Sequence, residues 1–206
     1  MVEPPLAMAA LSTQEESKAV QPVSSLAVLT SLRKLPMFET YQANKSTYDF
    51  EWPTKSVLKT ITRADQLRLK EIRYQQDALG IITALKIVCQ DAQSPFFSGA
   101  LDKKVPPLVL NVNNSFFDTK DGHYRCNNIV ARIEINDQIS NIYFNEDKQG
   151  IQRIGTRRGN GVLSHVYMEP GEQIVGVYGC YGEIVDRSFI SSLGFIVWKP
   201  DAAKEQ

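Results

Sequence analysis

The sequence is poor in the residues that carry most metal and covalent chemistry. It has three cysteines and two histidines among 206 residues. Cys89, Cys126 and Cys180 lie far apart and form no C-x-x-C pair, which argues against a disulfide framework and favours a reducing compartment. Neither His123 nor His165 has a second ligand at metal-binding spacing. We therefore expect no metal site and no cofactor.

Charge and hydropathy exclude further classes of protein. Acidic and basic residues number 23 each, so no overall field attracts nucleic acid or an anionic membrane. A run of about 20 apolar residues is also missing, so no membrane span is expected. Walker, G-x-S-x-G, G-x-G-x-x-G and EF-hand patterns are absent. These absences predict a protein that is not an enzyme.

The start of the sequence differs in composition from the rest. Glycine is absent before residue 80, whereas five of the ten prolines precede residue 54. This composition predicts an extended, partly helical N-terminal arm over residues 1–54. One piece, Ser24–Leu35, carries Leu26, Leu29 and Leu32 at helical spacing. So short a helix is marginal in water, so its apolar side would need a partner surface; a disordered tail is the alternative.

A short pattern occurs three times in the remainder of the sequence. It reads Ile, Ser or Thr, any residue, Leu or Ile, any residue, apolar, and begins at Ile82, Ile139 and Ile190. The starts lie 57 and 51 residues apart. Each copy follows a predicted strand; these strands are Leu69–Tyr74, Ile129–Ile135 and Ile174–Tyr178. Three hairpins at near-constant spacing predict three small antiparallel sheets around one core.

Residues 65–88 allow two interpretations. Their apolar residues suit a bulged strand, but five also fit one helical face: Leu69, Ile72, Leu79, Ile82 and Leu85. Gly80 followed by β-branched residues favours strands. Further strands are expected at Val109–Val112, Val162–Met168 and Phe189–Trp198.

The span from Phe144 to Pro200 resembles the end of a jacalin-like lectin domain. It has the Pro170–Glu172 turn, an Ile-Val-Gly-x-x-Gly run from Ile174 to Gly179 and a closing Leu-Gly-Phe-Ile-Val. Upstream, Leu69–Phe97 resembles the first repeat of that family. The resemblance covers residues 55–200, before a tail at 201–206. It implies an all-β, three-fold pseudo-symmetric β-prism that binds ligands, usually sugars, without catalysis.

The resemblance also points to a carbohydrate site. In this family the last loop typically reads G-x-x-x-D and meets a glycine-rich N-terminal segment, and its acid accepts hydrogen bonds from sugar hydroxyls. The matching residues are Gly182, Glu183, Ile184, Val185 and Asp186. The closing strand, however, aligns with Ser191 where the acid would fall, and the N-terminal glycines are absent. A solvated turn is the alternative.

A second candidate surface is basic. Arg157 and Arg158 lie within the glycine-rich stretch Gly155–Gly161, and with Arg153 before it they could bind an anion or an acidic protein partner. A solvated hairpin is the alternative.

Two functions from different classes follow. The first is a non-enzymatic structural subunit of a large cytoplasmic assembly, such as a cytoskeletal or ciliary lattice, with the arm as a tether to protein neighbours. The alternative is a cytoplasmic lectin that binds a glycan through the Gly182–Asp186 loop. The first 20 residues lack a basic start and contain Glu3, Glu15 and Glu16, which disfavours secretory and mitochondrial signals.

Overall fold

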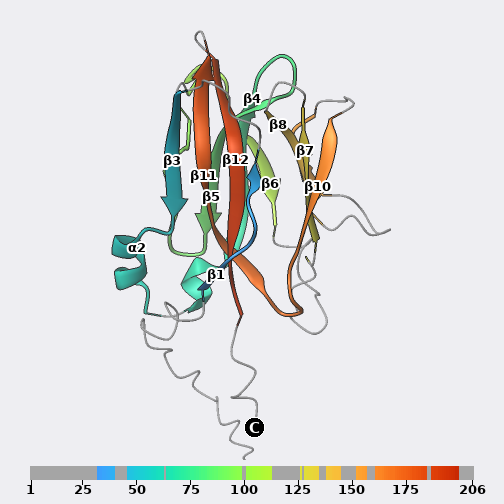
Figure 1. The fold of residues 1–206 in the computed structure, drawn as a ribbon. Helices are drawn as coiled ribbons and strands as arrows, with labels where there is room; N and C mark the ends of the chain where they lie inside the picture. Colours follow the sequence, from blue (N-terminus) through green and yellow to red (C-terminus); the bar gives the residue numbers. More distant parts are fainter. Residues whose placement is uncertain are drawn as a thin grey trace, which may run out of the picture.

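A computed structural model describes most of the chain from residue 32 onward (Figure 1). The described residues are 32–39, 46–62, 64–98, 101–112, 126, 128–134, 138–144, 152–156, 161–184 and 187–199. They are mainly β-strand, with one short α-helix, α2 (Lys55–Thr60), and a 3-10 helix, η1 (Ala64–Leu67). The predicted tail at 201–206 lies outside them.

The strands of these residues form three antiparallel sheets. The first has the order β1 (Leu32–Lys34), β12 (Arg187–Trp198), β11 (Gln173–Ile184) and β3 (Ser46–Trp52), with β2 (Phe38–Glu39) also on β12. The second has the order β10 (Val162–Tyr167), β7 (Asn128–Ile133), β8 (Ile139–Phe144) and β9 (Gln152–Ile154). The third has the order β5 (Ile82–Cys89), β4 (Leu69–Gln76) and β6 (Leu108–Asn111).

Each sheet is built on one hairpin, and the repeated pattern lies in its second strand. In all three hairpins the register shifts at the Ser or Thr of the pattern, so Thr83, Ser140 and Ser191 are each the extra residue of a β-bulge. The Ser191 hydroxyl donates to the carbonyl oxygen of Cys180, and the Ser140 hydroxyl lies 3.4 Å from the carbonyl oxygen of Arg132. The pattern therefore specifies the same local kink three times, and the predicted three-fold pseudo-symmetric prism is confirmed.

The three hairpins share one hydrophobic core. Strands β5, β8 and β12 come into contact with one another, and Phe144 of β8 packs edge-on against Phe195 of β12 with ring centroids 5.7 Å apart. Both rings are almost fully buried, and each such burial stabilises the fold by roughly 1.5–3 kcal/mol. Residues 69–76 and 82–89 are strands. The helical interpretation of residues 65–88 is therefore wrong, apart from the 3-10 turn at Ala64–Leu67.

The first sheet includes residues of the predicted N-terminal arm. Strands β1, β2 and β3 all precede residue 55 and flank the β11–β12 hairpin. The helix predicted over Ser24–Leu35 is wrong at its C-terminal end, because Leu32–Lys34 pair with Ile196–Trp198. The free edge of β12 supplies backbone partners there, and this tertiary pairing outweighs a weak helical periodicity. Leu26 and Leu29 lie outside the described residues.

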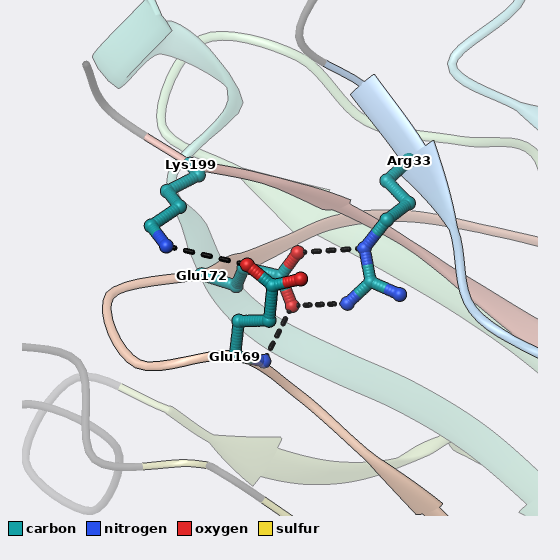
Figure 2. Close-up of polar contacts among 4 residues, drawn as sticks. All are labelled: Arg33, Glu169, Glu172 and Lys199. Atoms are coloured by element: carbon teal, nitrogen blue, oxygen red, sulfur yellow. Dashed lines mark hydrogen bonds and ion pairs between the residues drawn. The ribbon is translucent and has the colours of Figure 1, made fainter.

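The Glu172 carboxylate, on the Pro170–Glu172 turn, binds Arg33 and so holds β1 on the domain (Figure 2). Arg33 donates from Nε to Oε1 of Glu172 at 2.8 Å and from Nη2 to Oε2 at 2.6 Å. The backbone N–H of Glu169 donates to Oε2 of Glu172 at 2.7 Å, and Lys199 lies 3.3 Å from the Glu169 carboxylate. The Glu172 side chain is 4% exposed, so its charge depends on these partners rather than on water.

Tyr178 makes a second attachment of the same segment. Its ring lies against Gly194, where an added Cβ would stand 2.3 Å from a ring carbon. Its hydroxyl donates to the carbonyl oxygen of Leu35, and the Lys34 ammonium lies 4.9 Å from the ring centroid. The absence of a side chain at position 194 therefore makes room for the ring that holds residues 34 and 35 on the sheet.

We predict that Glu172→Gln lowers stability at neutral pH by about 1–2 kcal/mol, because it removes charged hydrogen bonds whose value is reduced by the partial exposure of Arg33. Burial by itself raises the pKa of Glu172, but the hydrogen bonds from Arg33 and Glu169 and the charges of Arg33 and Lys199 lower it below 4.5. This contribution is present above pH 4.5 and is lost as pH falls through the folded-state pKa. Urea unfolding of both proteins should therefore converge in acid; a constant difference would contradict this.

We also predict that Gly194→Ala destabilises the domain by about 1–3 kcal/mol, since the new methyl group overlaps the Tyr178 ring. In a Tyr178→Ala background the same substitution should cost only a few tenths of a kcal/mol, because the ring is gone. A double-mutant cycle measured by chemical unfolding checks this. Equal costs in the two backgrounds would show that the ring contact is not the reason for glycine.

Candidate functional site

The turn end of the β11–β12 hairpin lies beside the start of β3 (Figure 1). Tyr181 is opposite Tyr48, and Glu183 is opposite Ser46. Because residues two apart in a strand share a face, Tyr48, Tyr181 and Glu183 lie on one face of the first sheet. These three residues, together with the half-buried Ser98, are called the hairpin-end site below.

Aromatic rings form a continuous row on this face. The ring centroids of Tyr48 and Tyr181 are 5.2 Å apart, those of Tyr181 and Phe50 are 6.4 Å apart, and Phe50 stacks on Phe97 at 4.4 Å. Phe50 and Phe97 are buried, whereas Tyr48 is 49% exposed. The row therefore begins in the core and ends in a ring at the surface whose position is fixed by stacking.

Polar groups accompany the exposed ring. Glu183 is exposed, and the residue opposite it in β12 is Ser188. The Ser188 hydroxyl accepts a hydrogen bond from the Ser98 hydroxyl at 3.3 Å. Hydroxyls both donate and accept, whereas an ionised carboxylate only accepts. The hairpin-end site thus combines an aromatic face with a charged acceptor on the same sheet face.

The acidic side chains at the other two hairpin ends accept hydrogen bonds from residues of their own hairpins. The Asp77 carboxylate accepts from the backbone N–H groups of Leu79 and Ile81 at 2.8 and 2.9 Å. Glu134 is buried and accepts from the Ser140 hydroxyl at 2.8 Å. Glu183, by contrast, is exposed. Of these three pseudo-symmetric ends, the β11–β12 end therefore presents its described acid to solvent.

The residues predicted from the G-x-x-x-D pattern have different positions. Gly182, Glu183 and Ile184 are paired strand residues of β11 rather than loop, and Val185 and Asp186 lie outside the described residues. An added Cβ at Gly182 would stand 2.6 Å from the Phe189 ring, so this glycine makes room for packing. Ser191 is fully buried at its bulge and cannot contact a ligand at the surface.

The predicted basic and partner surfaces are described only in part. Arg153 is exposed on β9, while Arg157 and Arg158 lie outside the described residues. Leu32, predicted to contact a partner, instead packs against the domain's own core from β1.

The cysteines show no site chemistry. Cys89 and Cys126 are buried, and burial raises the pKa of the Cys89 thiol to about 12. Cys180 is half-buried, with its sulfur 2.9 Å from Oδ1 of Asp49. Over the part of the chain with described structure, no group of three potential metal ligands is found. Within the same residues, no helix has the length and apolarity needed to span a membrane.

Comparison with known proteins finds similarity to lectin domains. Residues 110–200 match the jacalin-like lectin domain, which confirms the resemblance over that range. No curated protein matches the chain. Among solved structures, a prostate-specific glycoprotein lectin has 15% identity and a TM-score of 0.49, over 80% of this chain and 99% of that one. The Calystegia sepium agglutinin has the same identity and TM-score, over 82% and 99%. A mannose-binding jacalin-related lectin from Ananas comosus has 17% identity and a TM-score of 0.46, over 82% and 99%.

We predict opposite results for two neighbouring serines of β12. Ser191→Ala should cost about 1 kcal/mol of stability, because its hydroxyl donates to the Cys180 carbonyl oxygen at 3.1 Å. Ser192→Ala should be neutral or slightly stabilising, since the buried Ser192 hydroxyl has no hydrogen-bond partner among the described residues. Thermal unfolding of the two variants checks this. Loss of ligand binding by Ser191→Ala without loss of stability would contradict the bulge role.

Proposed function

We propose, from the match of residues 110–200 to the jacalin-like lectin domain, that this chain is a non-enzymatic binding module whose ligand is a carbohydrate. Its binding surface is the hairpin-end site. The observation that carries this proposal is the exposed Tyr48 ring, held by stacking on Tyr181 beside the exposed carboxylate of Glu183.

The chemistry of a sugar suits this combination of groups. A pyranose has an apolar face of C–H groups, which packs on an aromatic ring, and hydroxyls at its rim, which donate to a carboxylate. Because Tyr48 is already fixed by its neighbour, little side-chain entropy is lost when a ring packs on it. Glu183 is therefore the proposed acceptor of hydrogen bonds from sugar hydroxyls, the role that the G-x-x-x-D pattern predicted for Asp186.

We predict that Tyr48→Ala and Glu183→Gln each weaken binding at least about tenfold for any glycan that the unaltered chain retains on a glycan array. Affinities are measured by calorimetry on the best glycan. The matched controls are Tyr167→Ala, an exposed tyrosine on β10, and Asp91→Asn, an exposed acid beyond the end of β5. Both controls should bind as the unaltered chain does.

Asp186→Asn separates the two candidate acids. The proposal expects it to retain binding that Glu183→Gln loses. If Asp186→Asn abolishes binding while Glu183→Gln does not, the acid is Asp186. If the array shows no glycan above background, the carbohydrate proposal fails.

The structural-subunit function remains a second proposal, supported by the apolar residues of the N-terminal region at Leu26 and Leu29. Its test must spare β1, β2 and β3, because these strands belong to the first sheet. A chain lacking residues 1–31 should elute outside the large complex in which the endogenous protein elutes. Unchanged elution of the truncated chain, or elution of the endogenous protein as a free monomer, would contradict it.

A further inference from the structure

The segment Leu101–Val109, which precedes and enters β6, is apolar and yet exposed. Its larger aliphatic side chains are between 37% and 47% exposed: Leu101, Val105, Leu108 and Val109. Pro106 and Pro107 lie among them and restrict the backbone. Leu108 and Val109 are consecutive in β6 and lie on opposite faces of its sheet, so Leu101 and Val105 share a surface with only one of them. Exposed apolar side chains on one side of a segment are typical of an interaction surface.

A buried glutamine holds this segment in one conformation. The Gln75 side chain is 5% exposed; its Nε2 donates to the carbonyl oxygens of Asp102 and Val105 at 2.7 and 2.6 Å, and its Oε1 accepts from the Asp102 N–H at 3.2 Å. The Val105 N–H also donates to the Asp102 carbonyl oxygen at 3.3 Å. The apolar side chains are therefore presented by a preorganised turn.

The exposed charges of the segment are Lys103 and Lys104 against Asp102, which leaves one net positive charge. The Asp102 carboxylate accepts from the Lys104 backbone N–H at 2.8 Å, so part of its hydrogen-bonding capacity is used within the turn. Lys103 and Lys104 are both exposed. Two ammonium groups thus lie in the same short segment as the exposed aliphatic side chains.

We propose that this segment, which we call the lysine–aliphatic turn, docks on an anionic lipid surface. A bilayer interface offers negative charge and an apolar layer together, and lysine stems reach along apolar surface while their charges stay at the headgroups. A protein partner is less suited, because protein interfaces are depleted in lysine and their strongest contacts rarely use leucine or valine. This surface is separate from the hairpin-end site and does not depend on the proposed function.

The attraction is local and reversible. Acidic and basic residues balance over the whole sequence, so no long-range field adds to the two lysines. Each basic residue near an anionic leaflet contributes about fivefold to the binding constant. Binding should therefore weaken steeply as salt is added.

The test is co-sedimentation of the full chain with vesicles of phosphatidylserine and phosphatidylcholine in equal parts, and with phosphatidylcholine alone. Lys103→Glu with Lys104→Glu should reduce binding to the mixed vesicles at least about tenfold. The charge-matched control is Lys55→Glu with Lys59→Glu, on the exposed face of α2, which should bind as before. Leu101→Ser with Leu108→Ser should also lose binding, whereas Leu79→Ser, at a 55% exposed leucine in the β4–β5 turn, should not.

We expect the unaltered chain to bind the mixed vesicles. The two turn variants should lose this binding, and the two control variants should keep it. The proposal is overturned if the chain does not sediment with mixed vesicles, which is also the outcome if the turn binds a protein instead. It is equally overturned if phosphatidylcholine alone binds as well, or if the α2 control loses as much as the turn variant. If each variant keeps the unfolding temperature of the unaltered chain, a loss of vesicle binding is not caused by misfolding.

Discussion

The prism depends on the pairing of its first described strands with its last hairpin. Strands β1 and β2 pair with β12, and β3 pairs with β11, so the five-stranded sheet joins segments from opposite ends of the sequence. The Arg33–Glu172 ion pair and the Tyr178 hydroxyl bond to Leu35 hold this closure (Figure 2). The same closure brings Tyr48 onto Tyr181, and the proposed carbohydrate site exists only because of it.

The repeated pattern was sufficient to predict most of the prism because it reports a local feature. At Thr83, Ser140 and Ser191 a bulge lies two residues before a core Leu or Ile, so the same short sequence occurs at all three. Strands β1, β2 and β3 were missed because low glycine and high proline content over residues 1–54 suggested an arm. The alternation of Tyr48, Phe50 and Trp52 in Ser46–Trp52 is a strand signal that could have corrected this.

The candidate site could be predicted only where its residues are close in sequence. The G-x-x-x-D pattern led to Glu183, which the structure places at the exposed hairpin end. Tyr48 and Ser98 come from β3 and from the segment after β5, and only tertiary pairing brings them to this hairpin. Ser191 aligned with the family's acid, but the bulge turns its hydroxyl toward the Cys180 carbonyl oxygen and buries it.

The most direct test of this account is hydrogen exchange, followed by mass spectrometry, of the amides of β3 in the full chain. If β3 completes the first sheet as its edge strand, those of its amides that bond to β11 should exchange far more slowly than the amides of an unstructured peptide. Exchange of β3 at the rate of an unstructured peptide, beside a protected β11, would contradict the closure and with it the proposed site.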